Sequence, residues 1–233
     1  MTQWLGGVLA CFALLVQAPM LQAGDIEGQK PVLFVADSFQ FLPGAWARYA
    51  VHDGQSGEAY RFWIATLDKK STGRKPSSWM EIEVEAAGTP PVVTRFLVRE
   101  TPEGPGDLLE VVVQMRGYAP FVVPEKYFKA EDGLKEVGQF QAARTVRRVA
   151  EASRVVAGRE VPVVEIEAID AQGRPMTAVV STRVAPIGVI DAEAAGTRMT
   201  LEDWGDGASS RIDGKPLNFY YWIMRQIGVE LFK

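Results

Sequence analysis

Residues 79–86, which read WMEIEVEA, decide the fold that we expect for this chain. Every second residue from Met80 onward is apolar, and Glu81, Glu83 and Glu85 alternate with these apolar residues. A period of two is typical of a β-strand that buries one face and exposes the other to solvent. We therefore expect a strand whose apolar side chains face a core and whose three glutamates face water.

Similar runs lie on both sides of this stretch. They are short, rich in β-branched and aromatic residues, and separated by turn residues at intervals of about 8–12 residues. This spacing predicts one antiparallel sheet system. The expected strands are residues 45–51, 60–67, 79–86, 92–100, 108–116, 145–150, 153–157, 161–168, 176–184, 188–194 and 197–204.

The sequence also predicts the structure of two segments that connect these runs. Residues 69–78 are basic and contain Ser, Gly and Pro, which indicates a loop. Residues 129–143 are mixed and polar, and we expect a short helix there that Gly133 and Gly138 weaken.

Charged residues on the expected strands predict ion pairs between neighbouring strands. Arg95 and Arg99 share one face, from which we expect them to lie across from the glutamate row of residues 79–86. Arg148 and Arg154 are expected to balance glutamates on adjacent strands.

The C-terminal part of the chain has a different pattern. Residues 216–226 predict a helix, with Pro216 at its first position and an apolar stripe at a spacing of i, i+3, i+4 and i+7. This helix is apolar nearly all round, so it needs cover on several sides. We expect it to plug or cap the sheet, and the alternative is a helix that binds a partner or a membrane surface.

The N-terminus indicates export from the cytoplasm. Residues 4–16 carry no charge, and residues 21–23 read LQA, which suits signal peptidase cleavage after Ala23. We therefore expect a signal peptide at residues 1–23, a single β-rich domain at residues 24–233 and a periplasmic location. The alternatives are a buried N-terminal helix, or lipidation of Cys11 at a faint lipobox.

Composition excludes several kinds of chemistry. The 233 residues include one His and one Cys, which excludes His/Cys metal clusters and disulfide frameworks. A net charge of −4 argues against nucleic-acid partners. The chain has no GxSxG, P-loop or GxGxxG motif, and His52 is placed at an expected hairpin tip, which is poorly suited to a catalytic base. We expect no catalytic residue, no metal site and no cofactor.

Acidic clusters leave room for other interpretations. A carbohydrate hydrolase needs two carboxylates that face each other across a cleft, and the rows at Glu81, Glu83, Glu85 and at Glu165, Glu167 fit solvated strand faces better. Residues 203–207, which read DWGDG, could hold calcium, although such clusters are common in turns.

Four short segments resemble a known group of proteins. Residues 41–49 contain a G-x-W-x-x-Y pattern, and residues 179–190 read as a strand, a turn with proline and a second strand. Together with residues 79–81 and 96–98, they resemble uncharacterised secreted bacterial proteins related to the LolA/LolB-like half-barrel group. The chain departs from this pattern at Val180, where the group has a bulkier residue.

This resemblance implies a mainly β fold. The expected architecture is a strongly curved antiparallel sheet, a half-barrel, with one or two helices closing an apolar concave face. Well-known members of the wider group carry lipoprotein acyl chains or lipids across the periplasm. The resemblance assigns no catalytic residue to this chain.

We predict that the concave face binds an apolar ligand such as a lipid or acyl chain, unless its residues simply form the core. The leading hypothesis is a non-enzymatic periplasmic lipid- or lipoprotein-binding protein. One alternative is an envelope module that docks a protein partner through its sheet edge and C-terminal helix, and another is a carbohydrate-active hydrolase. The predicted lining residues are Trp46, Phe62, Ile64, Met80, Ile82, Phe96, Val98, Val111 and Val113.

Overall fold

The computed structural model describes residues 35, 38–54, 56–72, 75–102, 104–128, 143–170 and 173–231. The expected signal peptide and nearly all of the helix expected at residues 129–143 lie outside these ranges. Within them the chain is mainly β, with twelve strands in one sheet and one α-helix. The elements are β1 (Trp46–Asp53), β2 (Ala59–Thr72), β3 (Lys75–Ala86), β4 (Val92–Thr101), β5 (Gly104–Met115), β6 (Phe121–Val122), the 3-10 helix η2 (Glu125–Tyr127), β7 (Arg144–Val156), β8 (Arg159–Ile169), β9 (Pro175–Val180), β10 (Val189–Ala194), β11 (Thr197–Gly205), β12 (Leu217–Asn218) and α3 (Phe219–Leu231).

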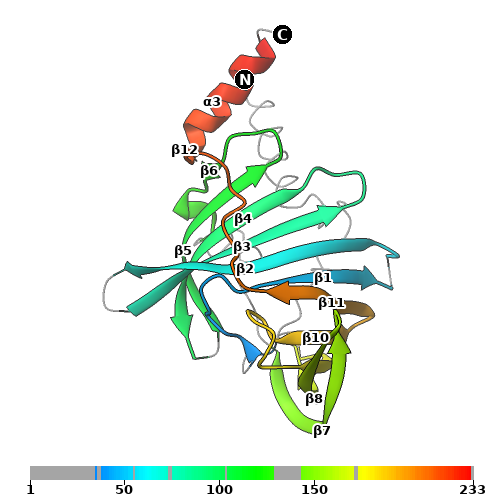
Figure 1. The fold of residues 1–233 in the computed structure, drawn as a ribbon. Helices are drawn as coiled ribbons and strands as arrows, with labels where there is room; N and C mark the ends of the chain where they lie inside the picture. The colour runs from blue at the N-terminus through cyan, green and yellow to red at the C-terminus, as the bar shows by residue number, and fades with distance from the viewer. Residues whose placement is uncertain are drawn as a thin grey trace.

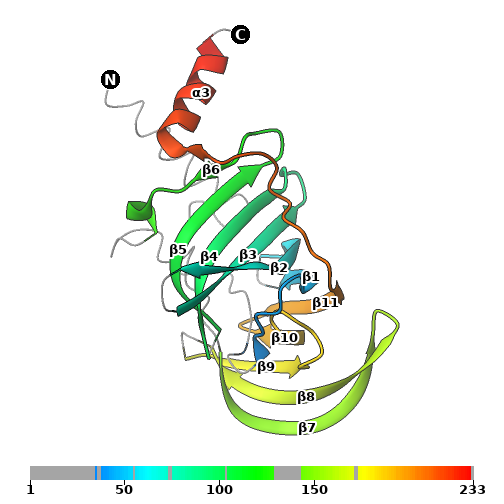
Figure 2. The same cartoon turned by 60° about the vertical axis from the view of Figure 1, so that its left-hand side comes forward.

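The sheet joins two antiparallel meanders. Its strand order is β12-β6-β5-β4-β3-β2-β1-β11-β10-β9-β8-β7. Strands β1–β5 form one meander and β7–β11 the other, and they meet where β1 pairs with β11 (Figure 1). Among the described strands, the short pair of β12 and β6 is the one that runs parallel. The sheet curls without closing into a barrel, so it is a half-barrel with one C-terminal helix (Figure 2).

One face of this curled sheet carries the main hydrophobic core. Side chains from both meanders belong to the same buried cluster, including Phe62 of β2, Phe96 of β4, Val163 of β8 and Met199 of β11. Residues so far apart along the strand order can pack together only where the sheet curls toward itself. We call this the inner face, and the opposite one the outer face.

The hairpin of β2 and β3 is longer than the sequence pattern predicts. Its strands stay paired as far as Thr72 and Lys75, with a register shift between Thr66 and Lys69. The prediction of a loop at residues 69–78 is therefore wrong. Backbone hydrogen bonds need no apolar side chains, so a ladder can continue through a polar segment that periodicity assigns to a loop.

Helix α3 begins later than expected and ends later. Leu217 and Asn218 form β12 beside β6, and the helix covers Phe219–Leu231 rather than residues 216–226. Asn218 caps the helix, because its Oδ1 accepts a hydrogen bond from the backbone N–H of Tyr220 at 3.0 Å. Among the described residues, no helix is both long and apolar enough to span a membrane.

A segment without regular structure links β11 to β12. Residues 206–216, which we call the strap, run across the outer face of β1–β5, as the orange-brown trace in Figure 1 shows. Ile212 of the strap packs on Val93 and Val112, and the backbone N–H of Asp213 donates to Oε1 of Gln114 at 2.8 Å. The strap therefore covers a face that the alternation of residues assigned to solvent.

Candidate functional site

The structure places eight of the nine predicted lining residues on the inner face. Seven of them belong to the buried core, and the eighth, Ile82, is partly buried against it. Side chains from successive strands form rows across the sheet, as where Met80 lies opposite Phe96 and Phe96 lies opposite Val111. The eight residues are Phe62, Ile64, Met80, Ile82, Phe96, Val98, Val111 and Val113.

Trp46, the ninth predicted residue, does not lie on the inner face. It is opposite Ala65 in the register of β1 and β2 and packs in an outer-face cluster with Trp63. Its indole Nε1 donates to the backbone oxygen of Asp206 in the strap at 3.3 Å. Strand β1 instead turns Ala47 and Tyr49 inward, and the charged Arg48, which shares the face of Trp46, marks that face in the sequence as the outer one.

A loop between β9 and β10 covers one part of the inner face. Val184 and Ile187 of this loop are fully buried in the main core. The Oγ of Ser38 donates to the backbone oxygen of Ile187 at 2.7 Å and holds the loop in place. Gly188 has a φ of +70°, and a Cβ there would meet Ser38 at 2.6 Å, so the close approach requires glycine.

Tyr49 and Thr66 each place a hydroxyl group on the largely apolar inner face. The Oη of Tyr49 donates to the backbone oxygen of Val189 at 2.9 Å, and burial raises the pKa of Tyr49 well above its ordinary value. Thr66 lies opposite Met80 and is fully buried, yet its Oγ1 has no hydrogen-bond partner among the residues that the structure describes. Sequence analysis missed Thr66 because no motif marks a lone threonine at a strand position.

The prediction that the β3 glutamates face water is wrong for two of the three. Glu81 and Glu83 are buried, whereas Glu85 is exposed. Glu81 accepts hydrogen bonds from the Oγ of Ser210 at 2.7 Å and from the backbone N–H of Arg211 at 2.5 Å, and Arg211 also forms an ion pair with Glu83. The strap thus neutralises and covers carboxylates that would otherwise be solvated.

Arg211 also lies 3.9 Å from the ring centre of Trp63, measured from Cζ. Burial lowers the pKa of this guanidinium, an effect partly opposed by Glu81. No sequence signal pointed to Ser210 or Arg211, because they lie more than 120 residues from their partners on β3. These contacts hold the strap against the outer face.

The predicted ion pairs between strands are met only in part. Arg95 lies opposite Glu81 in the register, but its guanidinium is placed over the ring of Trp79 and donates to Ser210 at 3.3 Å. Arg99 pairs with Asp107 at 3.1 Å rather than with the glutamate row. Ser210 of the strap thus hydrogen-bonds both Arg95 and Glu81, in place of the direct pair that the register offers.

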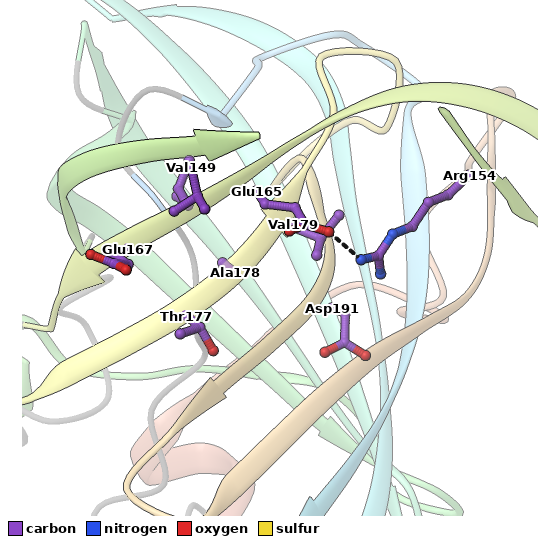
Figure 3. A pocket seen from close by; sticks show the side chains of 9 residues that line it. Val149, Arg154, Glu165, Glu167, Thr177, Ala178, Val179 and Asp191 are labelled. Atoms are coloured by element: carbon purple, nitrogen blue, oxygen red, sulfur yellow. Dashed lines mark hydrogen bonds and ion pairs between the residues drawn. The ribbon is translucent and has the colours of Figure 1, made fainter. Parts of the chain in front are cut away.

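Strands β7–β10 carry a pocket of about 290 Å³. Figure 3 shows Arg154 reaching back to Glu165, with an N–O distance of 2.6 Å. This confirms the prediction for Arg154, whereas Glu167 is bound by Arg147 and not by Arg148. The lining residues are Val149, Arg154, Glu165, Ile166, Glu167, Thr177, Ala178, Val179 and Asp191.

The pocket shows no sign of hydrolase chemistry. Each of its carboxylates is held in an ion pair, and that of Asp191 is bound by Arg198 at 2.9 Å. A glycosidase needs one carboxylic acid in an apolar setting, whereas each carboxylate of this pocket lies beside an arginine guanidinium group. Asp203 of the acidic turn at residues 203–207 is likewise paired, with Arg159 at 2.9 Å. Among the described residues, no group of His, Cys, Asp or Glu side chains could hold a metal ion.

Helix α3 contacts the half-barrel through one face of its first turns. Phe219 and Trp222 pack on Phe121, and the indole Nε1 of Trp222 donates to the backbone oxygen of Ala119 at 2.9 Å. The helix then projects beyond the sheet (Figures 1 and 2). Its exposed side chains include Tyr220, Tyr221 and Met224.

Comparisons with known proteins place the fold only loosely. No family model matches the chain, and no curated protein matches it. Among solved structures, a predicted exported protein with a YmcC-like fold from Bacteroides fragilis is 7% identical, with a TM-score of 0.36 over 73% of this chain and 100% of that chain. A predicted lipoprotein from Parabacteroides distasonis is 8% identical, with a TM-score of 0.38 over 73% of this chain and 99% of that chain.

A β-barrel-like protein of the domain of unknown function DUF1849 from Brucella abortus is 14% identical, with a TM-score of 0.32 over 73% of this chain and 100% of that chain. All three scores are below 0.5, so these similarities carry no argument about function. The relationship to LolA/LolB-like proteins stays a prediction, whereas the open, curled sheet is a property of this structure.

Proposed function

We propose that this protein is a non-enzymatic envelope protein that binds the acyl chain of a lipid or lipoprotein on the inner face of its half-barrel. The observation that carries the proposal is the combination of an open, curled sheet with rows of apolar side chains across β2–β5. Export is supported by the charge-free stretch at residues 4–16 and the cleavage signal before residue 24.

The chemistry of the inner face suits an acyl chain. Phe62, Met80 and Phe96 offer flexible or flat apolar surfaces, and each methylene that leaves water contributes about 0.8 kcal/mol. Methionine adapts its shape to an irregular partner more easily than branched side chains do. The buried hydroxyl of Thr66 supplies a donor for a carboxyl or ester oxygen at one end of the chain.

Two consecutive valines of β5 make a matched test. Val111 points to the inner face and Val112 to the outer face, and both are buried. We would purify the natural protein, Val111→Phe and Val112→Phe from the bacterial envelope without detergent, then identify extracted lipids by mass spectrometry.

The proposal predicts that the natural protein and Val112→Phe carry lipid, whereas Val111→Phe carries at least tenfold less and melts at an unchanged or higher temperature. Filling a space meant for a ligand costs little, whereas overpacking a filled core costs about 1–3 kcal/mol. A lipid-free natural protein, together with equal destabilisation by both substitutions, would mean that the inner face is an ordinary core.

A further inference from the structure

The two edge strands of the sheet differ in length and in what covers them. At one end, β12 has two residues, and α3 follows it directly. At the other end, β7 has thirteen residues, and β8 is the one described strand that pairs with it (Figure 2). Apart from β8, the described residues that border β7 are those of the isolated bridge of Val35 with Ala143, just before the strand, and a small contact with β11.

Long free edges are unusual because their unpaired N–H and C=O groups invite another strand. Chains protect such edges with short strands, prolines or cover, and β12 follows that rule. Strand β7 does not: it is long and has no proline, and three of its valines are exposed. These are Val146, Val149 and Val155, with 58%, 52% and 73% of their surface accessible.

The charges of β7 favour one kind of partner. Its sequence, RTVRRVAEASRVV, contains four arginines and one glutamate, although the whole chain has a net charge of −4. Arg147 and Arg154 are bound by glutamates of β8, whereas the exposed Arg144 and Arg148 form no ion pair with any residue that the structure describes. The edge therefore presents positive charge between exposed valines.

The register shows where a new strand would fit. Strand β7 has register shifts between Thr145 and Arg147 and between Arg148 and Ala150, and such bulges protect only the first half of its edge. From Ala150 to Val156 the ladder with β8 is regular. This regular half can accept backbone hydrogen bonds from an added strand, and the bulged half places the two unpaired arginines beside it.

We propose that the free edge of β7 binds an extended acidic segment of a partner protein, which adds to the sheet as a further antiparallel or parallel strand. Backbone hydrogen bonds hold the segment, its apolar residues contact the exposed valines, and its carboxylates pair with Arg144 and Arg148. A second copy of this chain fits less well, because two strands with four arginines and one glutamate each would be brought together.

Synthetic peptides test this directly. We would measure the binding of a fluorescent heptapeptide of alternating Val and Glu to the full-length protein by anisotropy, beside a Val/Lys peptide and a Val/Glu peptide with every second amide N-methylated. Hydrogen–deuterium exchange of the β7 amides reports whether a strand is added. The protein variants are the double substitution Arg144→Glu with Arg148→Glu, and the control Arg116→Glu with Lys215→Glu, which reverses two exposed charges near the opposite end of the sheet.

We expect the Val/Glu peptide to bind, to slow exchange of the β7 amides and to lose affinity about tenfold in the double variant but not in the control. The Val/Lys and N-methylated peptides should not bind. Equal binding of the N-methylated peptide, an unchanged affinity in the double variant, or no protection of β7 by millimolar Val/Glu peptide would each overturn the proposal. Concentration-dependent dimers that protect β7 without peptide would assign the edge to a second copy instead. Lipid content is measured separately, so this result and that of the acyl-chain test do not depend on each other.

Discussion

The inner face of strands β1–β5 and part of their outer face are both buried, but different parts of the chain bury them. Inner-face side chains such as Ile64 and Met80 meet apolar groups from the other meander. Outer-face side chains meet the strap, which binds them through hydrogen bonds and ion pairs to Glu81 and Glu83. The outer face is thus fixed by directional contacts with one segment, whereas the inner face relies on contacts that another apolar body could replace.

The largest expected effect comes from removing the polar contacts between the strap and the outer face. Glu81→Ala leaves Ser210 and the backbone N–H of Arg211 without their acceptor, and we expect it to lower the free energy of unfolding by about 3 kcal/mol. Glu85→Ala, on the same face of β3 but exposed, should change it by less than about 0.5 kcal/mol. Urea unfolding measures both, and equal small effects would show that the strap is not held through Glu81.

Removing the apolar contact of the strap should lower stability somewhat less than removing its polar contacts. Ile212→Ala removes side-chain contacts with Val93 and Val112, and we expect a loss of about 2 kcal/mol. Hydrogen exchange at residues 206–216 should become faster, whereas inner-face strands keep their protection. The control Ser209→Ala alters an exposed residue of the same segment. If Ile212→Ala leaves exchange of the strap unchanged, hydrogen bonds alone hold it.

The smallest expected effect concerns a hydrogen bond of the inner face, and it is measured through the dependence of stability on pH. The buried hydroxyl of Tyr49 donates to Val189, so Tyr49→Phe should cost about 1 kcal/mol at neutral pH. Since burial raises the pKa of Tyr49, its contribution is fully present below the ordinary value of about 10 and is lost as the pH rises through the higher folded value. Stability of the natural protein should therefore fall above pH 10, and less steeply in Tyr49→Phe.

Tyr118→Phe is the control for this titration, because that tyrosine is 47% exposed. Its stability curve should follow that of the natural protein at every pH. An alkaline loss that is the same in Tyr49→Phe and in the natural protein would show that Tyr49 is not the group that titrates.

Local alternation was enough to predict the sheet and most of its inner face. The period of two in β2–β5 correctly placed residues such as Phe62 and Val111 on one face of the sheet. Residues that are paired in the register of neighbouring strands lie on the same face, so the pattern of one strand continues in the next. Trp46 was predicted on the wrong face although the same alternation places it with the charged Arg48, because the outer face also holds a small apolar cluster that includes Trp46 and Trp63.

The cover of the outer face could not be predicted in the same way. Glu81 and Glu83 read as solvated because their partners Ser210 and Arg211 come from a segment without periodicity, far along the chain. The start of α3 was missed for a similar reason, since Leu217 pairs with Phe121 before the helix begins. Contacts between remote segments leave little trace in a local pattern.

Photo-crosslinking tests the central claim most directly. The natural protein would be incubated with palmitate that carries a diazirine near its chain end, irradiated, digested and mapped by mass spectrometry. We predict adducts on inner-face positions of β2–β5, such as Met80 and Phe96, and competition by unlabelled palmitate. Adducts confined to the strap or to α3, or adducts that unlabelled palmitate does not reduce, would contradict an acyl-chain site on the inner face.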